Sequence, residues 1–105
     1  MESIYVSGPY TQGNTETNVI KAILIADALA EKGWAPFIPH LTYCWNALIS
    51  HDYEFWMKQD LFWVGVTQAL FRMEGFSPGA EREVALAKSL GKPVYYKLDD
   101  VPKIK

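Results

Sequence analysis

The chain has 105 residues, a net charge of -2 and a single cysteine. This length predicts one domain, residues 1–105, and the mixed charges form no basic stripe, which excludes a nucleic acid polymer as the main ligand. Cys44 alone cannot form an internal disulfide and is typical of a reducing compartment, and no apolar run approaches the length of a membrane span. We therefore expect a cytoplasmic protein without membrane contact.

The predicted elements alternate between strands and helices. Short β-branched and aromatic runs predict strands at 3–7, 34–38, 69–73 and 93–97, and apolar periodicity with end signals predicts helices at 15–32, 52–66 and 78–90. This order predicts an α/β fold, a small Rossmann- or flavodoxin-like open sheet of about four parallel strands with helices on both faces. We expect residues 40–51 to form a long loop and the tail, 98–105, to be loosely held. Ligands bind at the carboxyl ends of such strands, so the loops after Ser7, Ile38 and Met73 should share one pocket.

The predicted helix at 78–90 has clear end signals and a misplaced carboxylate. Ser77 is a typical N-cap, Pro78 suits the first helical position, and Gly91 suits the C-terminal stop. Glu83 falls on the apolar face, where a desolvated carboxylate is costly unless another group compensates. The helix start can also hold an anion. A capped surface helix with one partly exposed glutamate is the alternative.

The predicted helix at 52–66 repeats this pattern. Asp60 lies at the centre of one apolar face, and Phe55, Phe62 and Val66 form a second apolar stripe opposite it. The second stripe predicts a two-fold contact with an identical subunit, although it could instead pack beneath the long loop. Asp27 also falls among apolar residues, without any chemical context, so an inward carboxylate is an indication only.

Two inward carboxylates beside a helix start and a glycine-containing loop predict a site for a phosphate or a sugar. Glycosyl transfer or hydrolysis needs such a pair, one acting at the anomeric carbon and the other on the proton of the leaving group. The chain has no P-loop, no GxGxxG and no nucleophile elbow. The spacing of His40, Cys44 and His51 matches no common zinc site, so we expect neither a metal nor a cofactor, and the two histidines are loop residues that could touch the ligand.

Several motifs resemble the nucleoside 2-deoxyribosyltransferase-like superfamily, which includes the deoxynucleoside 5′-monophosphate N-glycosidases, and above all its short branch. They are IYVSGPY at 4–10, Asn18, GWAPFIPHLT at 33–42, YEFWMKQDL at 53–61 and ALFRMEGFSPGAEREVALAKSLGKPV at 69–94. The most specific is Ser77-x-Gly79-Ala80-x-x-Glu83, placed after Asp60.

The resemblance implies a role for each matching residue. Glu83 would be the nucleophile that takes the deoxyribosyl group, and Asp60 would assist at the base and the sugar. Ser77 and the helix start would hold a 5′-phosphate, Tyr5 would lie near the carboxylates, and Gly8 would belong to a loop over the nucleotide. The full set expected to bind the substrate is Tyr5, Ser7, Gly8, Tyr10, His40, Ser77, Gly79 and Ala80.

The sequence thus predicts an enzyme that acts on the N-glycosidic bond of a (deoxy)nucleoside or its 5′-monophosphate. The partners expected are this small molecule and a second copy of the chain. The chain departs from the resemblance at Thr67-Gln68, where short relatives usually carry Cys-Asp, and in the loop 9–14, which lacks a phosphate-gripping arginine. The missing acid at Gln68 and the small size of the chain favour an alternative, a non-catalytic module that binds or senses nucleotides. A dimerising structural protein is the third possibility.

Overall fold

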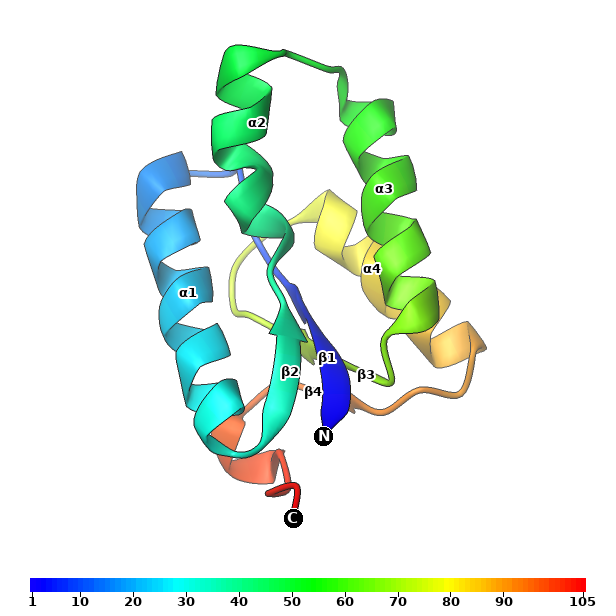
Figure 1. Cartoon of the computed structure of the whole chain (residues 1–105). Helices are drawn as coiled ribbons and strands as arrows, with labels where there is room; N and C mark the ends of the chain where they lie inside the picture. The colour runs from blue at the N-terminus through cyan, green and yellow to red at the C-terminus, as the bar shows by residue number, and fades with distance from the viewer.

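The computed structural model describes all 105 residues and contains one parallel sheet with helices on both faces (Figure 1). The strand order is β2-β1-β3-β4, and all three pairings are parallel. This arrangement confirms the predicted α/β fold. The strands are β1 (Glu2–Ser7), β2 (Trp34–Phe37), β3 (Ala69–Arg72) and β4 (Val94–Tyr95), and the helices are α1 (Thr15–Glu31), α2 (Tyr43–Leu48), α3 (Tyr53–Val66) and α4 (Pro78–Ser89).

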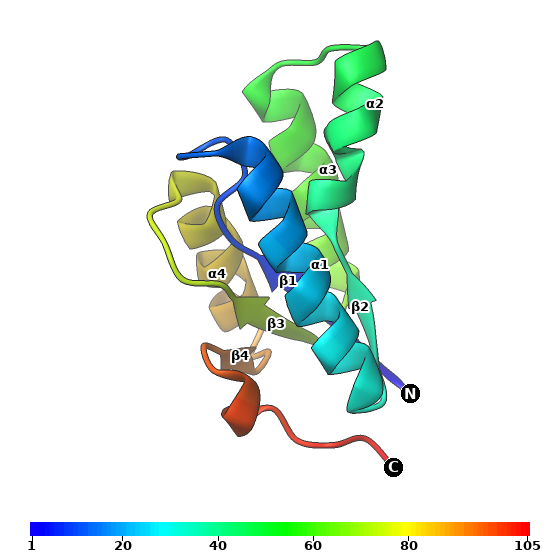
Figure 2. The same cartoon turned by 90° about the vertical axis from the view of Figure 1, so that its left-hand side faces the viewer.

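Helix α1 covers one face of the sheet, and α3 with α4 covers the other (Figures 1 and 2). The cause is the alternation of side chains along β1, because successive residues of a strand point to opposite faces. Ile4 and Val6 join the core beneath α1, while Tyr5 joins the core beneath α3 and α4. Ser7 is fully buried and turns to the same side as Tyr5. On the face of the sheet that α4 covers, polar groups therefore lie near the carboxyl ends of the strands.

The helix ends follow the predicted signals. Asn14, Asp52 and Ser77 each accept a hydrogen bond from a backbone N–H of the helix that they precede. Gly33 and Gly91 follow α1 and α4 with φ values of +95° and +72°, which glycine adopts without the penalty that other residues incur. Local sequence thus fixes where each long helix begins and stops.

Two predicted segments differ in the structure. Residues 40–51 are not a continuous loop, because a 3₁₀ turn, η1 (Pro39–Thr42), runs directly into α2. The tail is packed instead of loose: Val101 is buried, Lys32 Nζ donates to the carbonyls of Leu98 and Val101, and Trp34 Nε1 donates to the carbonyl of Pro102. These donors lie far from the tail in sequence, so its polar composition gave no sign of them.

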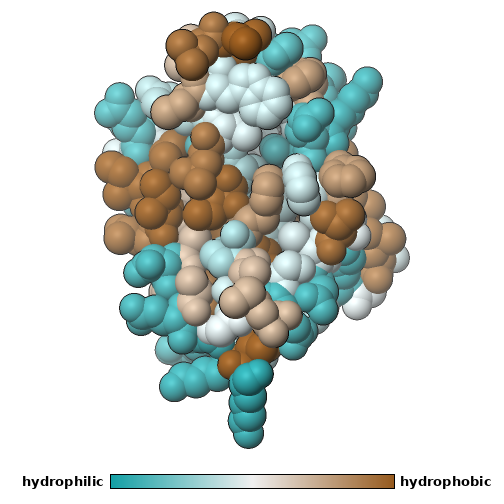
Figure 3. Space-filling model, in the orientation of Figure 1, coloured by the Kyte–Doolittle hydropathy of each residue, from teal (hydrophilic) through white to brown (hydrophobic).

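Large apolar side chains remain exposed on the helices (Figure 3). Helix α1 exposes Ile20, Ile23 and Leu24, and α3 exposes Phe62, Trp63 and Val66. Asp27 is also exposed, so the face of α1 on which it lies is an outer face. The carboxylates that turn inward are therefore those of α3 and α4. No helix is long and apolar enough to cross a membrane.

Candidate functional site

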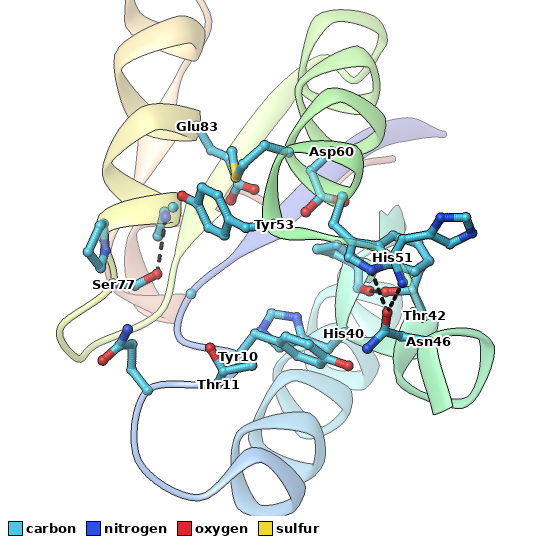
Figure 4. A pocket seen from close by; sticks show the side chains of 18 residues that line it. Tyr10, Thr11, His40, Thr42, Asn46, His51, Tyr53, Asp60, Ser77 and Glu83 are labelled. Carbon is cyan, nitrogen blue, oxygen red and sulfur yellow. Dashed lines mark hydrogen bonds between the residues drawn. The ribbon is translucent and has the colours of Figure 1, made fainter. Parts of the chain in front are cut away.

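A cavity of about 410 Å³ opens at the carboxyl ends of the strands (Figure 4). The loop after β1, the η1–α2 segment, α3 and the start of α4 supply its wall. This is the edge at which the loops were expected to meet. The lining residues are Gly8, Tyr10, Thr11, Gln12, Pro39, His40, Thr42, Asn46, His51, Tyr53, Trp56, Met57, Asp60, Ser77, Pro78, Gly79, Ala80 and Glu83.

Glu83 is the buried carboxylate of this cavity. Its side chain projects from the second turn of α4 towards the sheet, and the residue is only 5% exposed. Tyr5 donates its hydroxyl to Oε2 at 2.8 Å, and Ser7 donates its hydroxyl to Oε1 at 2.7 Å. Tyr5 and Ser7 are two residues apart on β1, so both reach the same face of the sheet. One strand therefore fixes both oxygens of the carboxylate.

Asp60 faces the same cavity from α3 (Figure 4). Burial raises its pKa to about 7, and the negative charge of Glu83 adds to the rise. Burial also raises the pKa of Glu83 to about 7, although the hydrogen bonds from Ser7 and Tyr5 oppose it. Two acids that titrate near neutrality in one cavity can hold one proton between them. One can act as a carboxylate while the other acts as an acid.

Two of the residues expected to bind substrate have another position. Tyr5 and Ser7 do not line the cavity, because they lie behind Glu83 and direct their hydroxyls to it. Burial and the Glu83 charge raise the pKa of Tyr5 well above its usual value, so its hydroxyl stays protonated and remains a donor. These two side chains therefore hold the Glu83 carboxylate in position from outside the cavity lining.

The start of α4 forms one end of the cavity with Ser77, Gly79 and Ala80, as expected. Ser77 Oγ accepts from the N–H of Ala80 at 3.1 Å, and the Ser77 carbonyl accepts from the N–H of Glu81 at 3.1 Å. Pro78 has no N–H, so Gly79 supplies the free backbone donor of the first turn. A Cβ on Gly79 would lie 3.3 Å from the hydroxyl of Tyr53, which stands over this turn.

The loop after β1 closes the opposite wall. Asn18 donates to the carbonyls of Tyr10 and Gln12 and so holds the loop from α1. The Nε2 of His40 bonds the carbonyl of Pro9 at 3.0 Å, and burial lowers the pKa of this imidazole. At Gly8, a Cβ would lie 2.6 Å from Cβ of Met73. Gly8, Tyr10 and His40 thus lie in the cavity wall, and that they bind a substrate stays a prediction.

The sequence predicted Asp60 on α3 but not the other side chains that α2 and α3 bring to the wall. Trp56 and Met57 could have been found, since they precede Asp60 by about one helical turn and share its face. Thr42 and Tyr53 lie within motifs of the resemblance but were given no role, and nothing in the sequence marked Asn46. The His, Cys, Asp and Glu side chains form no group of three that could hold a metal ion.

Arg72, at the end of β3, has only internal partners. Its guanidinium donates to the carbonyls of Met73 and Gly75 and pairs with Glu81 at 3.0 Å. Its positive charge also opposes the rise in the pKa of Glu83. Arg72 therefore shapes the turn that leads from β3 into α4 and does not line the cavity.

Gln68, where the resemblance leads us to expect an acid, lies at the amino ends of the strands. Its Oε1 accepts from the N–H of Ser3 at 2.8 Å, and its own N–H donates to Ser3 Oγ at 3.0 Å. Ser3 lies near the amino end of β1, whereas Ser7 ends that strand beside Glu83. Gln68 thus joins β1 to the turn before β3 and lies outside the cavity lining.

A family model described as a domain of unknown function (DUF7768) matches residues 2–97. The chain belongs to this family. No curated protein matches the chain. Two solved structures share its fold, each with a TM-score of 0.63. A 2-deoxyribosyltransferase from the psychrotolerant bacterium Bacillus psychrosaccharolyticus is 25% identical, and the match covers 88% of this chain and 69% of that one. A 2-deoxyribosyltransferase from Leishmania mexicana is 19% identical, and the match covers 90% of this chain and 62% of the Leishmania chain.

Proposed function

We propose that this DUF7768 protein cleaves or transfers the N-glycosidic bond of a (deoxy)nucleoside or its 5′-monophosphate. One observation carries the proposal: Glu83 is buried, held at both oxygens, and shares a cavity with a second carboxyl group of raised pKa. A purely structural site would gain little from two such groups, because each destabilises the fold when it ionises. The likeness to 2-deoxyribosyltransferase structures supports the same reading.

In the proposed reaction, the Glu83 carboxylate attacks C1′ of the sugar while the bond from C1′ to the base nitrogen breaks. The transition state resembles an oxocarbenium ion, and the negative carboxylate stabilises it. Asp60 delivers its proton to the departing base, so the base leaves neutral. Water, for hydrolysis, or a second base, for transfer, then attacks C1′ of the glycosyl ester; the bond from C1′ to the Glu83 oxygen breaks, and the Asp60 carboxylate takes the proton of the incoming group. Tyr5 and Ser7 keep the attacking carboxylate in place throughout.

The same cavity supports a position for the sugar and its 5′ end. The turn of Ser77, Gly79 and Ala80 borders Glu83 within the cavity, so the 5′ group would meet this helix start when C1′ meets Glu83. The partial positive charge of the helix and the free N–H of Gly79 favour an oxygen-rich group there. We infer that this turn binds the 5′-hydroxyl or 5′-phosphate.

The deciding experiment incubates the purified protein with deoxynucleosides, ribonucleosides and their 5′-monophosphates, with and without a second base. Chromatography then measures the free base and the exchanged nucleoside. Base that appears at catalytic rates in the wild type and not in Glu83→Gln supports the proposal. Thermal stabilisation by the ligands without any turnover would instead support the nucleotide-binding module. Neither stabilisation nor turnover would favour the structural protein.

We also propose that the chain forms a homodimer through α3. Phe62 is 62% exposed and Val66 is 53% exposed, and Trp63 lies between them in sequence. Phe55, which was expected in the same stripe, is half-buried and stacks on His51 at a centroid distance of 3.7 Å. Light scattering should give a dimer mass for the wild type and a monomer mass for Phe62→Lys, with the far-ultraviolet spectrum unchanged. A monomeric wild type would refute this proposal.

A further inference from the structure

Asn46 lies in the cavity wall on α2, and its side-chain amide has a fixed orientation. Its Oδ1 accepts from Trp56 Nε1 at 2.7 Å and from the backbone N–H of His51 at 3.0 Å. Both partners can only donate, so the atom that faces them must be the oxygen and not the nitrogen. Figure 4 shows both bonds converging on this oxygen. The amide NH₂ is therefore the group left to face a ligand.

Thr42, four residues earlier, also lines the cavity and has the opposite polarity. Its hydroxyl donates to the carbonyl of Pro39 at 2.7 Å, and because a carbonyl cannot donate, the proton of Thr42 is committed to that bond. The lone pairs of Oγ1 remain, so Thr42 can only accept from a ligand. This wall of the cavity thus presents a donor at Asn46 beside an acceptor at Thr42.

The two residues lie away from the reacting end of the cavity. Glu83 and Ser77 occupy one side of the view in Figure 4 and Asn46 occupies the other, with Asp60 between them along the α3 wall. If C1′ meets Glu83 and the glycosidic nitrogen meets Asp60, the far edge of the base meets Asn46 and Thr42. That edge carries the exocyclic group and the adjoining ring nitrogen.

We infer that Asn46 and Thr42 select nucleosides whose base carries an oxo group beside a ring N–H, against bases that carry an amino group there. Uracil, thymine and hypoxanthine present a carbonyl oxygen to the Asn46 amide and an N–H to Thr42. Cytosine and adenine would set a donor against a donor and a lone pair against a lone pair. Asn46 and Thr42 are specificity-determining residues in this scheme. The inference rests on the proposed function, because that function places C1′ at Glu83.

Binding measured without turnover tests the inference separately from the reaction. In the Glu83→Gln protein, calorimetry should give a Kd for deoxyuridine at least roughly 10-fold lower than for deoxycytidine, and the same order for deoxyinosine over deoxyadenosine, since an unpaired buried polar group typically costs that much or more. Adding Asn46→Asp keeps the oxygen that Trp56 and His51 need and replaces the donor by an acceptor. The Kd ratio, which is the Kd for the amino-base nucleoside divided by that for the oxo-base nucleoside, should then fall at least 10-fold or drop below one.

Thr42→Val, which keeps the shape and removes the acceptor, should reduce the same ratio and supplies a second, independent variant. Gln59→Glu on the exposed side of α3 makes the same amide-to-carboxylate change outside the cavity and should leave the ratio unchanged. Equal Kd values for each oxo and amino pair, or ratios that neither Asn46→Asp nor Thr42→Val alters, would overturn the inference. If the wild type releases no base from any nucleoside, the proposed reaction fails while these Kd ratios still decide the selectivity.

Discussion

Polar groups at the amino ends of the strands, here called the amino edge of the sheet, differ in their environment from those at the carboxyl ends, the carboxyl edge. At the amino edge, Gln68 bonds Ser3, and Lys92 Nζ donates to the carbonyls of Val64, Gly65 and Thr67 at the end of α3. These polar groups are hydrogen-bonded to partners within the fold. At the carboxyl edge, Glu83 and Asp60 are buried and their pKa values are raised to about 7.

Polar groups at the amino edge stabilise the folded chain, whereas the buried carboxylates at the carboxyl edge destabilise it when they ionise. The pairs at the amino edge lower the free energy of the folded chain because they satisfy helix and strand ends. The carboxylates at the other edge raise it when they ionise, and the chain tolerates them because β1 supplies two hydroxyl donors. Changes at the two edges should therefore affect different measurements.

The largest effect is expected from Glu83→Gln. The amide keeps the size of the side chain and can still bond Tyr5 or Ser7, but it is a poor nucleophile. We expect kcat/KM for base release to fall roughly 10³-fold or more, while the melting temperature stays near that of the wild type. Glu31→Ala on the exposed end of α1 is a better control than Glu81→Ala, because Glu81 pairs with Arg72. Unchanged turnover in Glu83→Gln would exclude the nucleophile.

The pH dependence of activity is the next effect. Glu83 must be ionised to attack and Asp60 must be protonated to donate, and both pKa values are about 7. We expect a bell-shaped profile of kcat/KM centred near neutrality, with both limbs belonging to the coupled pair. Asp60→Asn should lower the maximum by roughly 10²-fold or more and remove the alkaline limb. A profile that keeps both limbs in Asp60→Asn would place the acid elsewhere.

The same two groups make stability depend on pH. Their folded pKa values exceed the unfolded ones, so the folded chain binds more protons between about pH 4 and 7. The free energy of unfolding should therefore fall as pH rises through this range and level off above about pH 7, by about 3 kcal/mol for each fully buried group and less for a partly exposed one. Asp60→Asn should show a smaller fall in denaturant titrations at pH 5 and 8. An equal fall in both proteins would refute the assignment.

The sequence predicted the sheet, the long helices and both inward carboxylates, because caps, breakers and apolar periodicity are local signals. The resemblance placed Tyr5 near the carboxylates, but these local signals could not predict that its hydroxyl holds Glu83, since Tyr5 lies 78 residues away in the chain. The sequence placed Asp27 on an inner face, whereas α1 packs on the sheet with small residues such as Ala22 and Ala26 and exposes its larger ones. Asn46 was missed because its hydrogen-bond partners decide whether its amide oxygen or its NH₂ group is left for a ligand, and only the folded structure shows those partners.

At the amino edge, Lys92→Met should change stability without changing activity. The ammonium group satisfies carbonyls at the end of α3 that have no partner within the helix. Losing these charged hydrogen bonds should lower the free energy of unfolding by about 2 kcal/mol, to the same extent at pH 5 and 8. Lys58→Met, on the exposed side of α3, should have little effect. A drop in kcat/KM with unchanged stability would mean that a change at the amino edge alters catalysis in the cavity.

The smallest effect is expected at Gln68, and it tests the one departure that had favoured a non-catalytic module. Gln68→Ala removes the acceptor for the N–H of Ser3 and should lower the free energy of unfolding by about 1 kcal/mol. Gln68→Asp introduces an acid at the amino ends of the strands, away from Glu83, so it should leave kcat/KM and its pH profile unchanged. A gain in turnover from Gln68→Asp would contradict the separation of the two edges, because it would require an acid beside Ser3 to act on a cavity formed beyond Ser7.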